Sequence, residues 1–265
     1  MHARSFSNLR RNFSVCALVL FLAFVPIGCG SGTTGNGSGP TWQYAALGDS
    51  LAAGLLAQEG YVSRYATYVN TDTGSKITTL NTGIPGWKSA DLLNALQKDP
   101  VFRNQVSGAE LVTWDIGGND FSGPHDSFVN NTCGGPDNQD CLRSAVSTFE
   151  TNWDAITVEL LKLRDPSKTI LRTMDIYNPY VAADTQAGRF ATLEPYLDQV
   201  NNHIHENAKA NNIPVAAVHT AFNGADGTTD PGTLGLMAAD GFHPNDAGHK
   251  VIADQFRALG YAPLH

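Results

Sequence analysis

The sequence predicts an α/β protein in which a five-stranded, mainly parallel sheet lies between two layers of helices. Short apolar runs typical of buried strands alternate along the chain with longer stretches typical of helices. The predicted strands cover 44–47, 77–80, 111–116, 169–174 and 215–218, and the predicted helices cover 61–70, 89–97, 141–164, 193–210 and 246–259. Strands that are separated by helices pair in parallel through right-handed crossovers, which gives a three-layer sandwich.

Further features of the sequence support three of these predicted elements. The first run, 44–47, is apolar and stops at Gly48. The fourth, 169–174, is rich in residues that favour strands, although Arg172 interrupts its apolar character. The stretch 141–164 has apolar residues three or four apart, as on one face of a helix: Val146, Phe149, Trp153, Ile156 and Leu160.

Residues 1–29 have the pattern of an export signal. Three arginines precede an apolar run from 13 to 27, which is short for a membrane span and suits a secretory signal. Gly28 and Cys29 then resemble the end of a bacterial lipoprotein signal, after which the cysteine is lipidated. Ordinary cleavage that removes Cys29 or leaves it free is the alternative. We therefore expect an exported protein, either anchored in the bacterial cell envelope or periplasmic or secreted.

The rest of the chain divides into a tether and one domain. Residues 30–40 are rich in Gly, Ser and Thr and would form a flexible tether of roughly 20 Å. Residues 41–265 suit a single domain with a substantial core. All 25 acidic and 14 of the 17 basic residues lie in this domain, so its formal charge is −11. This charge argues against nucleic acid or an anionic surface as a partner.

Cysteine usage fits an oxidising compartment. Cys133 and Cys141 flank a stretch that contains Gly and Pro, and we expect them to form a disulfide that closes a surface loop. A zinc site would need companion ligands, which the surrounding sequence lacks.

A serine stands where the first strand ends. Ser50 follows Gly-Asp in the stretch YAALGDSLAAG and would open a helix. A serine in this place either caps the helix or acts as a nucleophile once a base removes its proton.

One of the eight histidines is placed to be that base. Asp240 precedes His243 by three residues in ADGFHPNDAGH, so its carboxylate can reach Nδ1 and leave Nε2 for a serine. His203 and His205 are two apart on a predicted helix and make a poor metal pair. His219, at the end of the fifth strand, is a minor candidate for the base.

Two further blocks supply donors for an oxyanion. Asn119 follows the two glycines that end the third strand, and its amide is a neutral donor. Gly86, in NTGIPG after the second strand, offers a backbone N–H, and Ser50 offers another. The alternative is that these residues only build tight turns.

Together the blocks resemble the SGNH, or GDSL-type, serine hydrolase family: Ser50 in GDS, Gly86 in NTGIPG, Asn119 in GGND, and His243 with Asp240 in DGFH. The resemblance implies a flavodoxin-like α/β/α fold that cleaves carboxylic esters without metal or cofactor. It assigns Ser50, Asp240 and His243 as catalytic residues, and Ser50, Gly86 and Asn119 as the oxyanion hole.

The resemblance runs from residue 44 to about 258. The second block holds two glycines, and Gly86 is preferred to Gly83 because it lies five residues after Asn81, as in the family. Some relatives replace the acid by a backbone carbonyl, so the resemblance carries the role of Asp240 less firmly than that of the serine and the histidine.

The substrate is expected to be a small-molecule, lipid or carbohydrate ester, with short-to-medium acyl esters favoured. Deacetylation of an acetylated polysaccharide is the first alternative, and a non-catalytic, lipid-anchored sugar-ester-binding protein is the second. The inserts 121–140 and 219–239 are expected to shape the mouth of the site. The expected wall residues are Phe121, Phe222, Leu234, Leu236 and Met237.

Overall fold

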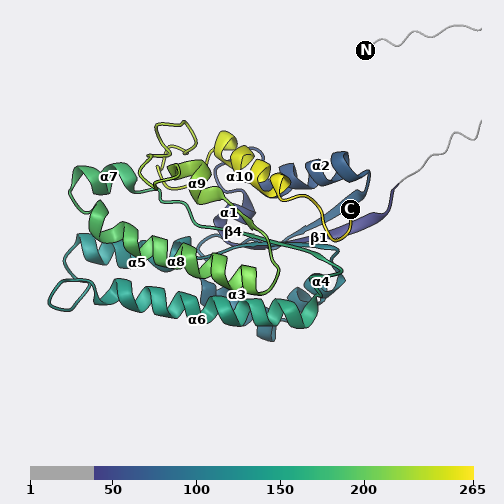
Figure 1. The fold of residues 1–265 in the computed structure, drawn as a ribbon, viewed down its shortest axis with the longest axis horizontal. Helices are drawn as coiled ribbons and strands as arrows, with labels where there is room; N and C mark the ends of the chain where they lie inside the picture. The colour runs from purple at the N-terminus through teal and green to yellow at the C-terminus, as the bar shows by residue number, and fades with distance from the viewer. Residues whose placement is uncertain (1–38) are drawn as a thin grey trace, which may run out of the picture. The chain divides into compact units, whose positions relative to one another are not determined.

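A sheet of five parallel strands, in the order β2-β1-β3-β4-β5, forms the centre of the domain (Figure 1). The structure is a computed structural model that describes residues 39–265. The strands are β1 (Thr41–Gly48), β2 (Lys76–Asn81), β3 (Leu111–Asp115), β4 (Ile170–Met174) and β5 (Val215–Ala216). This is the flavodoxin-like order, and it confirms the predicted fold class.

All five predicted helices are present. They are α2 (Tyr61–Thr73), α3 (Ser89–Lys98), α6 (Asp140–Leu163), α8 (Phe190–Ala210) and α10 (Asp246–Ala258). The structure adds α1 (Ser50–Ala53), α4 (Pro100–Gly108), α5 (Gly118–Val129), α7 (Val181–Gln186) and α9 (Val218–Asn223). Of these, only the start of α1 at Ser50 was expected.

Helix α5, which covers much of the insert 121–140, was not predicted. It contains Gly118, Gly123 and Pro124, and none of its residues is fully buried. It therefore lacks the apolar periodicity by which helices are recognised in a sequence. Helix α4 did carry a signal, because Asp99 caps it and Pro100 occupies its first turn.

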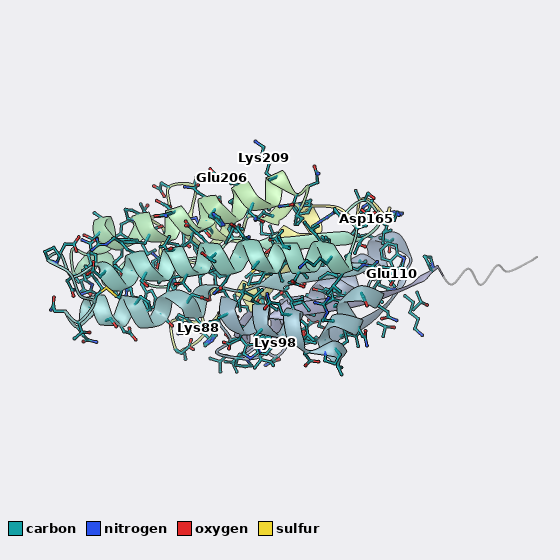
Figure 2. All side chains as sticks on the ribbon, turned by 90° about the horizontal axis from the view of Figure 1, so that it is seen from below. Lys88, Lys98, Glu110, Asp165, Glu206 and Lys209 are labelled. Carbon is teal, nitrogen blue, oxygen red and sulfur yellow. A yellow bond between two sulfur atoms is a disulfide. The ribbon has the colours of Figure 1, made fainter. Side chains whose placement is uncertain are left out.

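The helices cover both faces of the sheet (Figure 1). Because side chains alternate along a strand, Tyr44 and Ala46 of β1 pack with α2, α9 and α10, whereas Ala45 and Leu47 pack with α3, α4, α6 and α8. The outer surfaces of these helices are polar, and Glu206 and Lys209 of α8 project outward in Figure 2.

Arg172 is compatible with a buried strand because its guanidinium finds backbone acceptors. It donates to the carbonyl of Leu171 at 2.8 Å and to those of Gly260 and Ala262 at 3.2 and 2.8 Å. The residue that interrupts the apolar run thus fastens the C-terminal segment to β4.

The predicted disulfide between Cys133 and Cys141 is formed, with Cα atoms 4.8 Å apart. It closes the connection between α5 and α6. The predicted signal over 1–29, the lipidation candidate Cys29 and most of the tether lie outside the described residues. Within residues 39–265, no helix is long and apolar enough to cross a membrane.

Candidate active site

Ser50 lies at the carboxyl end of β1, next to the point where the strand order reverses between β1 and β3. Ligand sites of open α/β sheets form at this position. Gly48 allows the backbone conformation just before the serine. Its φ is 149°, and a Cβ at this position would lie 2.1 Å from Oδ1 of Asp115. Asp49, not Ser50, caps α1, because its Oδ1 accepts a hydrogen bond from the N–H of Leu51 at 2.9 Å. The hydroxyl of Ser50 is therefore not used as a cap.

His243 meets Ser50 across 193 residues of chain. Its Nε2 lies 3.0 Å from Oγ of Ser50, and its Nδ1 lies 2.5 Å from Oδ2 of Asp240. Burial would raise the pKa of Asp240, but hydrogen bonds from His243 and from the backbone N–H groups of Phe242 and His243 lower it below its usual value. Asp240 is thus an ionised partner for the imidazole at neutral pH.

The loop that carries His243 is held from two sides. Asn245 donates from its side chain to the carbonyls of Gly235 and Met237 at 2.8 and 2.9 Å. From the loop after β4, the hydroxyl of Tyr177 donates to the carbonyl of Phe242 at 2.7 Å. The position of His243 therefore depends in part on Tyr177, which no sequence pattern had indicated.

Asn119 lies in the first turn of α5, immediately after β3. Its Nδ2 donates to Oδ2 of Asp49 at 3.1 Å and to the carbonyl of Trp87 at 3.0 Å. These two bonds fix the amide beside the Gly-Asp-Ser block. They also use both of its hydrogens, so a bound oxyanion would have to compete with one of the two acceptors.

Gly86 is in a tight turn closed by a hydrogen bond from the N–H of Trp87 to the carbonyl of Ile84 at 3.1 Å. Pro85 precedes it and its φ is +84°, as in a type II turn. It is exposed and does not line the pocket beside Ser50. Gly83 is explained by packing, since a Cβ there would lie 2.4 Å from the backbone nitrogen of Ala53.

Two buried carboxyls lie beneath the serine. Asp115 accepts hydrogen bonds from the hydroxyl of Tyr61 at 2.5 Å and from the N–H of Asp49 at 3.1 Å. Burial raises the pKa of Asp115 to about 6. Burial and the charge of Asp115 also raise the pKa of Asp49. Through their hydrogen bonds to the backbone, Asp115 and Asp49 hold the end of β1 and the start of α1 in place.

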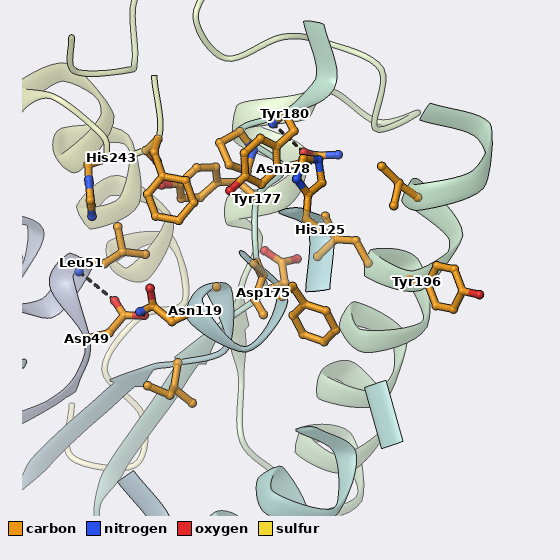
Figure 3. A pocket seen from close by; sticks show the side chains of 18 of the residues that line it. Asp49, Leu51, Asn119, His125, Asp175, Tyr177, Asn178, Tyr180, Tyr196 and His243 are labelled. Atoms are coloured by element: carbon orange, nitrogen blue, oxygen red, sulfur yellow. Dashed lines mark hydrogen bonds between the residues drawn. The ribbon is translucent and has the colours of Figure 1, made fainter. Parts of the chain in front are cut away.

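A largely apolar pocket extends from Ser50 and His243 (Figure 3). In this view Asp49, Asn119 and His243 lie toward the left, Tyr180 and His125 lie near the middle, and Tyr196 lies at the right. The apolar and aromatic wall residues are Leu51, Ile116, Phe121, Leu142, Met174, Ile176, Tyr177, Pro179, Tyr180, Leu193, Tyr196, Leu197 and Phe242.

The expected wall is only partly right. Phe121 lines the pocket, but the insert 219–239 does not. Phe222 and Leu236 are buried in the layer with α2 and α10, where Met237 packs against them, and Leu234 is 51% exposed. The segment after β4 and helix α8 take the place of this insert. The segment after β4 could have been expected to line the pocket, because it lies at the carboxyl end of a strand.

Three further histidines face a carboxylate without lining the pocket. Nε2 of His203 lies 2.8 Å from Asp154, and Nε2 of His205 lies 3.0 Å from Asp175. Nε2 of His219 lies 3.4 Å from Glu194. Within residues 39–265, no three His, Cys, Asp or Glu side chains gather as a metal site.

Two sequence relatives match most of the chain. The chain is 22% identical to the spore germination lipase LipC of Bacillus licheniformis, over 84% of this chain and 99% of that protein. It is 28% identical to the protein YpmR of Bacillus subtilis, which is uncharacterized, over 79% of this chain and 77% of that one.

Solved structures show the same fold. The lipase Lip_vut3 from a goat rumen metagenome superposes with a TM-score of 0.72 at 21% identity, over 84% of this chain and 100% of that one. The acetylxylan esterase Axe2 of Geobacillus stearothermophilus superposes with a TM-score of 0.60 at 20% identity, over 84% and 96% of the two chains. Residues 46–251 match the model of the GDSL-like lipase/acylhydrolase family. The chain therefore belongs to the GDSL-like lipase/acylhydrolase family.

Proposed function

We propose that this protein hydrolyses carboxylic esters through an acyl-enzyme formed on Ser50. The observation that carries the proposal is the contact of 3.0 Å between Oγ of Ser50 and Nε2 of His243, with Nδ1 held by Asp240. A serine, an imidazole and an ionised carboxylate in this order form the chain of hydrogen bonds that serine hydrolases use. Two structures of Axe2 are described as catalytic mutants in which a serine or a histidine is replaced by alanine, which supports the same pair here.

In the first half-reaction, Oγ of Ser50 attacks the ester carbonyl while Nε2 of His243 takes the hydroxyl proton. The carbonyl oxygen becomes an oxyanion, for which the proposed donors are the N–H groups of Ser50 and Gly86 and the amide of Asn119. The C–O bond to the alcohol then breaks, and His243 returns its proton to the leaving alkoxide. Asp240 holds the imidazole in the tautomer that these transfers require.

In the second half-reaction, water attacks the acyl-enzyme and gives its proton to His243. Collapse of the intermediate releases the carboxylic acid, and the proton returns to Oγ of Ser50. The products are one acid and one alcohol, and the enzyme is restored. The residues of the described domain account for each proton transfer.

Ser50→Ala tests this mechanism. We expect hydrolysis of nitrophenyl butyrate to fall by at least about 10³-fold, because the nucleophile is gone, while the protein stays folded. A fluorophosphonate should label the wild type at Ser50 and leave the variant unlabelled. Ser63→Ala, on the exposed surface of α2, is the matched control and should keep both ester hydrolysis and labelling by the fluorophosphonate. Activity that persists in purified Ser50→Ala would refute the proposal, and failure of the wild type to be labelled would favour a binding protein.

We also propose export, with a lipid anchor at Cys29. The described chain enters β1 at Thr41 and reaches Ser50 at the opposite edge of the sheet, about 26 Å away for an eight-residue strand. The tether over 30–40 would join the anchor to the end of β1 that is remote from the serine. Cys29→Ala should move the activity from the membrane fraction to the soluble fraction; an unchanged distribution would contradict the anchor.

A further inference from the structure

The pocket beside Ser50 ends against a small apolar cluster held by the disulfide. Leu142 and Leu193 line the pocket and are 3% and 8% exposed, and both pack with Cys133. Tyr196 packs against the same cluster and lies at the end of the pocket remote from His243 (Figure 3). We call Leu142 and Leu193 the floor of the pocket.

The disulfide fixes this floor to the rest of the domain. Cys141 directly precedes Leu142 in α6, and its N–H donates to the carbonyl of Cys133 at 2.9 Å. Its sulfur also lies 3.4 Å from the carbonyl of Pro124 in α5. The cross-link therefore holds the start of α6 against α5, which forms one side of the pocket.

Most polar side chains in the wall are hydrogen-bonded to protein partners, although Nδ1 of His125 has none. His125 bonds Asp184 at 3.0 Å, and Asp184 also accepts from Arg189 at 3.0 and 3.1 Å. Asn178 donates to Glu194 at 2.6 Å. Oδ2 of Asp175 is bonded to Nε2 of His205 at 3.0 Å. A sugar would need free donors and acceptors, whereas an aliphatic chain needs only the apolar surface that these residues leave.

Helix α5 gives a measure of the depth. Asn119, beside the serine, and His125, further along the pocket toward Tyr196, both line the pocket and are six residues apart. Six residues of α-helix rise about 9 Å, and an extended carbon chain advances about 1.3 Å per carbon, so roughly seven carbons fit this span.

The pocket suits the acyl group better than the alcohol. The acyl group stays bound to the serine while the alcohol departs and water enters. A pocket that ends against a packed floor can hold the group that stays, whereas the leaving group needs an open path to solvent.

We propose that this pocket takes an unbranched aliphatic acyl chain of about six to eight carbons, and that the disulfide-held floor of Leu142 and Leu193 sets that length. The inference rests on the proposed esterase function and adds its specificity.

The test is kcat/KM of the full-length protein on nitrophenyl esters with acyl chains of two to fourteen carbons. We expect a maximum at about six to eight carbons and a fall of about tenfold by twelve. Acetate esters of alcohols of increasing length should show no such maximum. A wild-type maximum at the acetyl ester, a profile without a maximum, or length selection on the alcohol side would overturn the inference.

Variants of the floor should move the maximum in opposite directions. Leu193→Ala should favour longer chains and Leu193→Phe shorter ones, and Cys133→Ser with Cys141→Ser should broaden the profile toward long chains. Phe128→Ala is the matched control, because Phe128 packs against the same cluster without lining the pocket. Identical profiles for Leu193→Ala, Leu193→Phe and Phe128→Ala would refute the role of the floor.

Failure of this inference is distinguishable from failure of the proposed function. Labelling of Ser50 by a fluorophosphonate together with hydrolysis that ignores acyl length would leave the esterase proposal intact and refute the acyl pocket. Loss of both labelling and hydrolysis in the wild type would refute the esterase proposal itself.

Discussion

The side-chain amide of Asn119 donates a hydrogen bond of 3.1 Å to the carboxylate of Asp49, 70 residues earlier in the chain. The same carboxylate accepts the N–H of Leu51 at 2.9 Å, so it orients the turn that carries the serine as well as the amide. Asp49 thereby ties a block after β1 to a block after β3.

Asp49→Asn should lower kcat by about 10- to 100-fold with a smaller effect on KM. The carboxylate of Asp49 accepts from the N–H of Leu51 and from Nδ2 of Asn119, whereas an amide has only one acceptor atom. One of these two donors would therefore face an N–H group, and Asn119 would turn away from the oxyanion. Steady-state kinetics on a nitrophenyl ester measure the effect. Asp126→Asn, an exposed neighbour on α5, should leave kcat unchanged. An unchanged kcat in Asp49→Asn would show that Asn119 is oriented by other contacts.

Asp240→Asn should lower kcat by about 10²- to 10⁴-fold. The amide can donate to Nδ1 of His243 and so favour the tautomer that cannot accept the proton of Ser50. Stopped-flow release of nitrophenol would measure the acylation step directly. Retention of most of the acylation rate would mean that the backbone alone orients the imidazole.

Tyr177→Phe should lower kcat by about tenfold. The substitution removes only the hydroxyl that donates to the carbonyl of Phe242 at 2.7 Å, and the loop that carries His243 loses its tie to the segment after β4. The ring still fills the wall of the pocket, so KM should change little. A rise in KM with unchanged kcat would instead assign Tyr177 to substrate binding alone.

Stability should depend on pH through the buried His249. Its Nδ1 accepts the N–H of Tyr61 at 3.2 Å, and burial lowers its pKa to about 4. Between pH 6.5 and 4 the unfolded chain therefore binds more protons here. The free energy of unfolding falls as the pH falls through this window, by about 3 kcal/mol in all.

Urea unfolding of the wild type and His249→Asn at pH 7 and pH 4.5 measures this contribution. Asp115 acts in the opposite direction, since its pKa is raised to about 6 and folding retains a proton that the unfolded chain releases. The contribution of His249 is therefore the difference in the free energy of unfolding between the wild type and His249→Asn. This difference should be smaller at pH 4.5 than at pH 7. Asn202→Ala, at an exposed position of α8 without a titratable group, should show a constant difference. A constant difference for His249→Asn would contradict the assignment.

The regular parts of the fold were predictable because they depend on local pattern. Apolar runs identified all five strands, and the spacing from Val146 to Leu160 identified α6. Helix α5 was missed because its glycines and Pro124 give no apolar period. Phe222 was misplaced because an apolar residue near a predicted site can equally face a core, and here it is fully buried behind the sheet.

The sequence by itself determined which chemical groups stand at the strand ends. Parallel strands end at one edge of the sheet, so blocks that follow them must gather there, and Ser50 and Asn119 do, while His243 reaches the serine from the loop before α10. Tertiary structure alone decided the length and walls of the pocket and the tie from Tyr177 to the histidine loop. These depend on how α5 and α8 each pack against α6 and on which side chains find partners across long separations. No local spacing in the chain encodes such contacts.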